Sequence, residues 1–192
     1  TFAVPKGFRL INTPQAVIAK GPNDAQIVFD LDPDPRAARN FRDPRNYITQ
    51  RWAAKVPVYD LESINVNGHP AATATTRMRS NGQVRDVRLL AVRFDDGRLY
   101  RMMFITRTGD TNRYSRPFRE TTYSLKALTD REASKLKAPR MQVATVRRGN
   151  TRKTFTRRMK GISDARETFD MINNLSPNAP LKVGTQVKYI GY

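Results

Sequence analysis

The chain of 192 residues contains no cysteine and a single histidine, His69. Without cysteine it forms no disulfide, offers no thiolate to a metal and has no cysteine nucleophile. A helical HExxH zinc site is excluded as well, because that site needs two histidines one turn apart. His69 lies in an Asn-Gly-His-Pro turn, and we expect it to be structural or merely exposed.

Long apolar segments are also lacking. No apolar run approaches the roughly 20 residues that a membrane-spanning helix needs, and no N-terminal signal pattern is present. The chain begins Thr-Phe without an initiator methionine, so we expect a processed protein or an excised fragment of a longer one.

No Gly-x-Ser-x-Gly elbow occurs, and the Asp95-Asp96 pair is more simply a turn former than a catalytic pair.

Acidic residues are scarce: 17 Asp and Glu stand against 35 Lys and Arg, for a net charge of +18. Such a surface attracts polyanions, which include nucleic acid, anionic lipid head groups and acidic envelope polymers. The 39% of apolar residues is sufficient for a packed core, so global disorder is not expected. Charge alone does not choose among these partners.

One hairpin organises the fold that we predict. Two apolar runs, Val87–Phe94 and Leu99–Ile105, flank Asp95-Asp96-Gly97. An Asp-Gly pair between β-rich runs favours a tight turn because glycine adopts positive φ without steric cost. Apolar side chains occupy both alternating sets of the first run, so both faces should be covered. We expect this hairpin to form the centre of an antiparallel sheet with helices packed on it.

Further strands are predicted on either side. The short β-rich runs 15–19 and 26–29 predict a second hairpin, and 61–66 and 70–79 predict two more strands. Between them, the acidic segment Asp30–Pro35 (DLDPDP) is predicted to be a loop. Its three aspartates resemble the start of a calcium loop, but the glycine and the distal glutamate of an EF-hand are missing.

Two helices complete this region. Asp43-Pro44 combines an N-cap residue with a proline at the first helical position, and the helix it starts should bury Trp52 and end before Pro57. A second apolar helical face should be formed by Tyr114, Phe118, Thr121, Leu125 and Leu128. Pro117 is expected in the first turn of that helix.

A domain boundary is predicted near the basic, proline-containing segment Lys135–Arg140. Before it, Thr129 and Glu132 form a capping-box pattern for a short helix. After it, the chain predicts a strand at 143–146, a helix starting at Thr151, a helix capped by Ser163-Asp164, and a strand at 186–190. We therefore expect an α+β protein with a first domain over residues 1–138 and a small β-α-α-β domain over residues 139–192.

The C-terminal segment resembles a LysM domain in its order and spacing. The resemblance is carried by VRRGNT (146–151), INNLSP (172–177) and LKVGTQVKYI (181–190). The chain departs from the family pattern at Asn150, which replaces Asp, and at Arg152 and Lys153, which replace a leucine and an aromatic residue. It also has Val183-Gly184-Thr185 in place of Pro-Gly-Gln. The resemblance implies a groove for N-acetylglucosamine-containing glycans between the first turn and the Asn-Leu turn.

Over nearly its whole length the chain also resembles the non-catalytic C-terminal region of periplasmic, BepA-like zinc metallopeptidases of the HtpX and CAAX-prenyl-protease family. FAVPKGFRLINTPQAVIAKGP (2–22), NGHPAATATTR (67–77) and FRETTYSLKALT (118–129) carry this resemblance. It implies that zinc is bound only by an upstream protease domain and that this chain holds no cofactor. Residues 1–135 are similar in element order to the PsbP and Mog-one type of α/β sandwich, a binding module.

The functional hypothesis is a non-catalytic accessory region of an envelope metalloprotease, located in the periplasm or at the cell envelope. Its partners would be the upstream protease domain, envelope proteins, and peptidoglycan or another anionic envelope polymer; the alternative is a basic nucleic-acid-binding protein. Residues 139–192 carry 11 basic and 3 acidic residues. On a helix from Thr151, Lys153, Arg157 and Lys160 would form one outer stripe. The candidate glycan- or polyanion-binding residues are Gly149, Asn150, Thr151, Arg152, Lys153, Arg157, Lys160, Asn173, Asn174 and Leu175.

Overall fold

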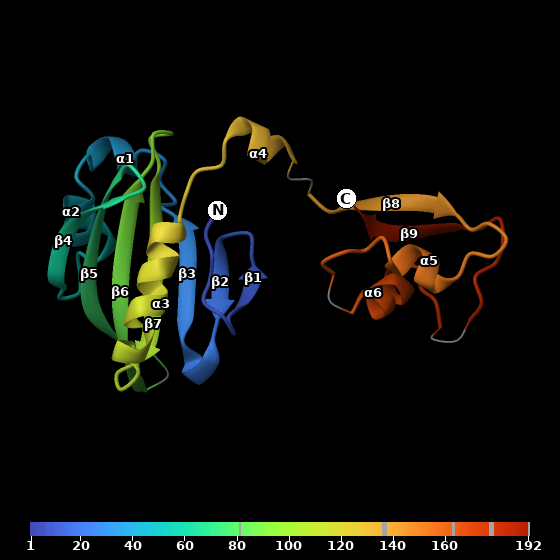
Figure 1. Ribbon diagram of the computed structural model, residues 1–192, viewed down its shortest axis with the longest axis horizontal. Helices are drawn as coiled ribbons and strands as arrows, with labels where there is room; N and C mark the ends of the chain where they lie inside the picture. The colour runs from blue at the N-terminus through green and yellow to red at the C-terminus, as the bar shows by residue number, and fades with distance from the viewer. Residues whose placement is uncertain (81, 136–137, 163, 177–178, 192) are drawn as a thin grey trace. The chain divides into compact units, whose positions relative to one another are not determined.

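The computed structural model describes residues 1–80, 82–135, 138–162, 164–176 and 179–191. They form two compact units, Thr1–Leu128 and Thr129–Tyr192, each described by itself below (Figure 1). The expected turn residue Asn81, the expected cap Ser163, and Pro177 of the LysM-like pattern lie outside the described residues. No described helix has the length and hydropathy to cross a bilayer.

The described residues of the first unit form a mixed α+β fold around a seven-stranded antiparallel sheet of order β1-β2-β3-β7-β6-β5-β4. The N-terminal strands β1 to β3 therefore join the rest of the sheet through β3, which pairs with β7, the last of the seven strands in sequence, rather than with β4. The strands are β1 (Arg9–Asn12), β2 (Ala16–Lys20), β3 (Gln26–Leu31), β4 (Tyr59–Val66), β5 (His69–Ser80), β6 (Gln83–Arg93) and β7 (Leu99–Arg107).

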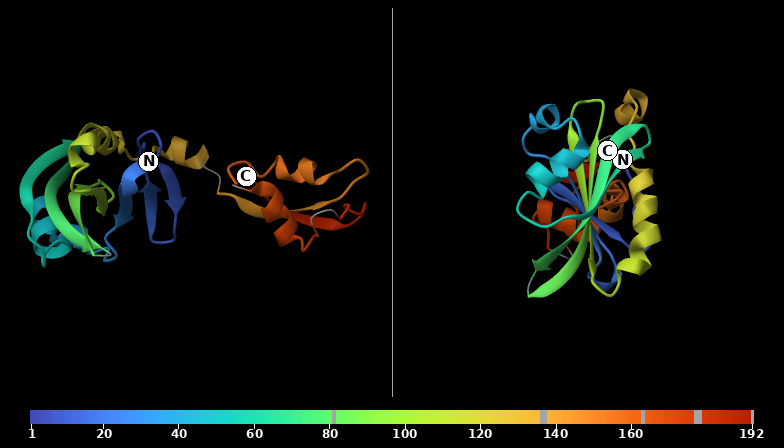
Figure 2. Two further views of the ribbon diagram at one scale, coloured as in Figure 1. Left: turned by 90° about the horizontal axis from the view of Figure 1, so that it is seen from below. Right: turned by 90° about the vertical axis from the view of Figure 1, so that its left-hand side faces the viewer.

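Helical segments cover both faces of this sheet. In the right-hand view of Figure 2 the strands lie between α3 (Thr111–Ser124) on one side and α1 (Ala37–Asn40) with α2 (Pro44–Tyr47) on the other. A π-helical turn, η2 (Ile48–Trp52), continues α2, and a short 3₁₀ turn, η1 (Pro22–Asp24), joins β2 to β3. The sheet is thus the middle layer of three.

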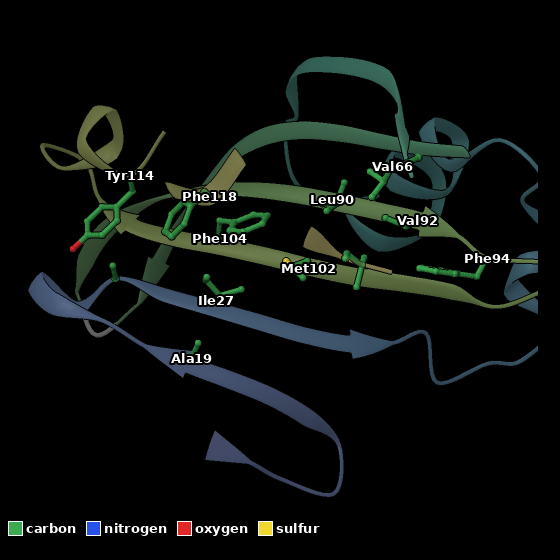
Figure 3. Close-up of a cluster of buried hydrophobic side chains, with 13 residues drawn as sticks. Ala19, Ile27, Val66, Leu90, Val92, Phe94, Met102, Phe104, Tyr114 and Phe118 are labelled. Atoms are coloured by element: carbon green, nitrogen blue, oxygen red, sulfur yellow. The ribbon is translucent and has the colours of Figure 1, made fainter. Parts of the chain in front are cut away.

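The predicted central hairpin is β6–β7, and both of its faces are covered as expected. Leu90 and Val92 of β6, and Phe94 directly after it, belong to the core under α3, part of which is drawn in Figure 3. The intervening Val87, Leu89 and Ala91 belong to a second core on the α1–α2 side. The alternation of a strand sends successive side chains to opposite faces, so two apolar sets on one strand build two cores.

The helix expected at Asp43 is present and begins as predicted. The Asp43 Oδ1 accepts a hydrogen bond from the backbone N–H of Arg45 at 2.8 Å, and Pro44 occupies the first helical position. Trp52 is partly buried against the second core. Its indole also lies 5.4 Å from the guanidinium of Arg101, so the only tryptophan reports on this face of the first unit.

The acidic segment that was predicted as a loop is partly a strand. Asp30 and Leu31 belong to β3, because Asp30 lies opposite Arg101 of β7 and accepts two hydrogen bonds from it. Asp32 accepts from the Arg51 guanidinium and, at 2.6 Å, from the Tyr47 hydroxyl. These carboxylates hold arginines instead of converging on a cation. Among the described residues no group of three metal-ligating side chains occurs.

Helix α3 begins earlier and ends earlier than its apolar spacing indicated. It starts at Thr111, so Pro117 lies inside the helix and not in its first turn, and it ends at Ser124. The end is fixed by Asn67, whose Nδ2 donates to the carbonyls of Tyr123 and Leu125 at 2.9 Å each. Leu125 is buried beyond the helix end.

The two units divide after Leu128, whereas the predicted first domain extended to residue 138. The backbone groups of Thr1 and Lys126 exchange hydrogen bonds, which ties the end of the first unit to its beginning. The capping-box helix is present as α4 (Asp130–Lys135): the Thr129 hydroxyl accepts from the Glu132 backbone N–H, and the Glu132 carboxylate accepts from the Thr129 backbone N–H. Helix α4 buries no residue, so it adds nothing to the core of the first unit.

The described part of the second unit has the predicted β-α-α-β order, with two antiparallel strands. Its elements are β8 (Arg140–Thr145), α5 (Arg152–Thr156), α6 (Ala165–Ile172) and β9 (Gln186–Gly191). The rings of Phe155 and Phe169 stack at 5.6 Å, and Met159 and Tyr189 are buried beside them. Side chains from α5, the turn after it, α6 and β9 therefore form the core of this unit.

Candidate functional site

The candidate residues of the second unit fall into a structural group and an exposed group. Thr151 is the N-cap of α5 in a capping box with Thr154. The Asn150 Oδ1 accepts from the Arg147 backbone N–H at 2.9 Å, and Gly149 takes φ +86 in the same turn. These three residues shape the turn before α5, and the side chains of Asn150 and Thr151 are used in forming it.

Arg152 was predicted to bind a ligand, but its side chain is 9% exposed and fully engaged within the unit. Its guanidinium donates to the Asp170 carboxylate and to the backbone carbonyls of Ser176 and Ala179. It therefore ties the start of α5 to α6 and to the segment that follows α6. The apolar position of the LysM pattern is occupied here by a structural cation with its own internal counter-ion.

The Asn-Leu turn is structural as well. Asn173 donates from Nδ2 to the carbonyls of Phe169 and Lys188 and accepts at Oδ1 from the Lys188 backbone N–H at 2.7 Å. Asn174 takes φ +51, and Leu175 packs against the core. Asn173 thus joins the end of α6 to β9, so its side chain is not open to a ligand.

Besides Arg158, whose guanidinium lies against the Tyr189 ring, five cations around α5 are exposed: Arg147, Arg148, Lys153, Arg157 and Lys160. We call them the basic cluster. In the described part of this unit the ion pairs join Arg152 and Arg166 to Asp170, and none involves the basic cluster. These charges are consequently free to meet an external anion.

The predicted stripe on α5 is shorter than its sequence spacing suggested. The Arg157 N–H donates to the Lys153 carbonyl, so these two side chains are one turn apart. The helix itself ends at Thr156, and the Met159 N–H donates to the Thr156 carbonyl, which tightens the following turn. Lys160 therefore belongs to the loop after the helix, because burial of Met159 in the core redirects the chain.

Sequence reasoning missed the residues that hold this surface in place. Asp170, the counter-ion of Arg152, is 18 positions away along the chain. The Arg158 guanidinium lies 5.6 Å from the Tyr189 ring centroid, and that ring is buried. Asp170 at i+4 from Arg166 could have been found as a helical ion pair. The Arg152–Asp170 contact has no local signal.

The single histidine has a packing role in the first unit. The His69 ring lies 4.1 Å from the Phe94 ring, centroid to centroid. Its Nδ1 is 3.6 Å from a carboxylate oxygen of Asp95, which is almost wholly exposed. The neighbouring Asp96 accepts from the Arg98 N–H and the Tyr100 hydroxyl. This arrangement supports the expectation of a structural histidine, and the aspartates organise the β6–β7 turn.

Comparisons with known proteins give a likeness in fold only. No family model matches the chain, and no curated protein matches it in sequence. A solved structure from Bacteroides thetaiotaomicron is 9% identical with a TM-score of 0.52, covering 90% of this chain and 55% of that one.

Two further solved structures are similar over a smaller part of the chain. LpqN, described as involved in cell envelope biogenesis of Mycobacterium tuberculosis, is 15% identical with a TM-score of 0.44 and covers 64% of this chain and 79% of its own. Cyanobacterial PsbP from Synechocystis is 13% identical with a TM-score of 0.42, covering 64% and 83% respectively. At these identities the comparisons concern an α+β fold built on a large antiparallel sheet, and they assign no family.

Proposed function

We propose that this chain is a non-catalytic accessory module of the bacterial cell envelope, and that its second unit binds an anionic envelope polymer such as peptidoglycan. The observation that carries the proposal is the basic cluster, whose five exposed cations have no ion-pair partner among the described residues of the unit. Unpaired surface cations attract polyanions over about 8 Å at physiological ionic strength.

The sequence resemblance of the second unit to LysM domains supports the choice of a cell-wall polymer. The unit has the β-α-α-β order of that family. Lys153 stands where an aromatic residue of the family would stack on a sugar ring, so charge replaces stacking as the source of affinity. Binding would then depend strongly on salt concentration and on the acidity of the polymer, and weakly on the identity of the sugar.

The module would belong to a larger zinc metallopeptidase of the HtpX and CAAX-prenyl-protease type. This chain lacks an HExxH sequence, so catalysis and zinc binding would reside in an upstream domain. The first unit would then contact that domain, its substrates or other envelope proteins. The test is the reading frame upstream of residue 1, where an HExxH helix is expected; its absence would remove the protease assignment and leave the binding proposal intact.

Polymer binding is tested by co-sedimentation with peptidoglycan, with anionic vesicles and with DNA, at low and at high salt. We expect peptidoglycan to retain the protein at low salt and to release it at high salt. The triple variant Lys153→Glu, Arg157→Glu, Lys160→Glu should lose this binding. The matched control variant is Lys6→Glu, Arg9→Glu, Lys20→Glu, which changes the net charge by the same amount at three exposed positions of the first unit.

The second candidate function, nucleic-acid binding, is favoured by the net charge of +18 and is separated by the same assay. Retention on DNA alone would favour it over the envelope role. Equal binding of both triple variants to every polymer would show that the total charge acts rather than the basic cluster, and would overturn the site proposal.

A further inference from the structure

A cavity of about 640 Å³ lies on the α3 side of the sheet in the first unit. This volume is within the roughly 300 to 1,000 Å³ typical of small-molecule sites. Strands β4 to β7 and the N-terminal half of α3 supply its walls, which include Tyr59, Arg88, Phe104, Thr106, Ser115 and Phe118. We call it the Arg88 cavity. Figure 3 shows Phe104 and Phe118, whose ring centroids are 4.9 Å apart.

Arg88 is held rigidly in the wall of this cavity by neutral groups. Its Nε donates to the Thr73 hydroxyl and its Nη2 donates to the Thr122 hydroxyl, both at 3.1 Å. Its guanidinium carbon lies 5.2 Å from the centroid of the Phe104 ring. Strand β5 and helix α3 therefore fix the guanidinium from two sides.

The cation has no carboxylate partner among the described residues. The hydroxyls of Thr73 and Thr122 donate their own protons to the carbonyls of Leu89 and Phe118, at 2.9 Å each, so toward Arg88 they act only as neutral acceptors. Burial lowers the pKa of Arg88, although a guanidinium remains charged. Glu62 of β4 attracts this cation electrostatically, but no salt bridge joins the two side chains. A half-buried charge without a directly bonded carboxylate is costly, and an anion that enters the cavity would lower that cost.

The free edge of the guanidinium suits a carboxylate. Of five N–H donors, one on Nε and one on Nη2 are used, which leaves the Nη1–Nη2 end available for two parallel hydrogen bonds. The acidic residues of the wall are already engaged. Asp86 accepts from Arg77 at 3.1 Å and from Thr111 at 2.7 Å, and Asp60 accepts from Thr75 at 2.7 Å.

We propose that the Arg88 cavity binds a small organic carboxylate that carries an apolar chain. The carboxylate takes the free edge of Arg88, and the chain lies against the rings of Phe104 and Phe118. This site is in the first unit and is independent of polymer binding by the basic cluster.

The test uses the full chain labelled with ¹⁵N and titrated with decanoate. The Nε–H resonance of Arg88 and the backbone resonances of Phe104 and Ser115 should shift in a saturable way. Decanamide, which has the same chain without the charge, should bind at least about tenfold more weakly, since hydrogen bonds to charged groups contribute about 1.5–3 kcal/mol. Acetate, which lacks the chain, should also bind much more weakly than decanoate.

Two variants examine the two parts of the site. Arg88→Met keeps a similar volume without the charge and should weaken decanoate binding by about tenfold or more. Ser115→Trp adds a bulky ring at an exposed wall position of α3 and leaves Arg88 in place. It should block decanoate binding, and it tests the site even if the Arg88→Met protein does not fold. Arg9→Met, on exposed β1, is the matched charge control and should bind as the parent does.

Several results would overturn the proposal. These are no saturable shift with decanoate, equal binding of decanamide, equal binding of acetate, or unchanged binding by a folded Arg88→Met or Ser115→Trp protein. Each outcome is independent of the co-sedimentation result, because that assay reports on the second unit.

Discussion

The Nε of Arg152 donates to the Oδ1 of Asp170, and this pair lies within the second unit with side chains only 9% and 15% exposed. The Arg152–Asp170 pair joins the first residue of α5 to α6. The remaining guanidinium donors reach two carbonyls beyond α6. This arginine thus takes the place of an apolar core side chain, and removing it should destabilise the folded second unit.

We expect Arg152→Met to lower the free energy of unfolding of the second unit by about 3 kcal/mol, because it leaves buried acceptors without their donor. Hydrogen–deuterium exchange should quicken in β8 and β9. The fluorescence transition of Trp52, which lies in the first unit, should not move. Lys153→Met, at an exposed neighbouring position, should change stability by less than about 0.5 kcal/mol. Equal effects of the two variants would contradict a structural role for Arg152.

The free energy of unfolding of the first unit should decrease as the pH is lowered from about 4 to about 2, in part because Asp32 becomes protonated. Burial raises the pKa of this carboxyl, but hydrogen bonds from Arg51 and Tyr47 outweigh it and lower the pKa to about 2. Because the ordinary value in an unfolded chain is about 3.9, the contribution is complete above that pH. It is lost as the pH falls through the folded value.

Asp32→Asn should therefore reduce the stability of the first unit at neutral pH and flatten its decline between pH 4 and pH 2. Urea titrations followed by Trp52 fluorescence at several pH values measure both effects. Asp95→Asn, at a carboxylate that is 95% exposed, serves as the control. An unchanged acid profile in the Asp32 variant would show that other carboxylates govern acid unfolding.

The contact from Asn67 to the end of α3 gives a third prediction. Asn67→Gly removes two hydrogen bonds to carbonyls but tolerates the backbone φ of +52, so we expect a loss of about 1–3 kcal/mol. Asn67→Ala should lose about 1 kcal/mol more, because a Cβ is disfavoured in the left-handed region. Urea unfolding followed by Trp52 fluorescence compares the two. Equal stability of the glycine variant and the parent would show that water replaces the side-chain donor.

Mild trypsin digestion should separate the two units. Helix α4 buries no side chain, and Arg131 and Lys135 are exposed, so cleavage after either residue is expected first. Mass spectrometry should then find a stable fragment that begins at Thr1 and ends at one of these two positions. Early cleavage after Arg88 or Arg101, inside the central hairpin, would contradict the division.

Zinc should not bind tightly to the chain. A single histidine and no cysteine supply too few ligands. Metal analysis of protein purified without a histidine tag should find well under one equivalent. Stoichiometric zinc held at micromolar or tighter affinity would refute this expectation and would direct attention to carboxylates of the first unit.

Local signals in the sequence predicted the elements that depend on local chemistry. The Asp-Gly turn gave the β6–β7 hairpin, and the Asp43 cap gave the start of α2. Alternating apolar residues in β6 correctly indicated two covered faces. The end of α3 was not predictable in this way, because it is set by Asn67, which is far away in sequence.

The candidate site was predictable in composition but only partly in geometry. The excess of basic over acidic residues in 139–192 predicted a basic surface, and the five side chains of the basic cluster are exposed. Arg152 was grouped with it because its partner Asp170 comes from another helix. Arg88 was not predicted as a site residue, since the threonines that hold it come from β5 and α3. The role of a side chain whose partners are distant in sequence cannot be predicted from its neighbours along the chain.

The pairing of β3 with β7 has a consequence for how the first unit is made. Gln26 pairs with Ile105 and Leu31 with Tyr100, so the N-terminal strands complete their hydrogen bonding only after the central hairpin has been synthesised. Closing so long a loop has an entropic cost that slows folding. During synthesis on the ribosome, the edge of β3 that pairs with β7 stays without hydrogen-bond partners until β7 is made, and the apolar β3 side chains Ile27 and Phe29 are not yet covered. A chain stopped before Leu99 would keep that edge exposed, and association with other chains would compete with folding.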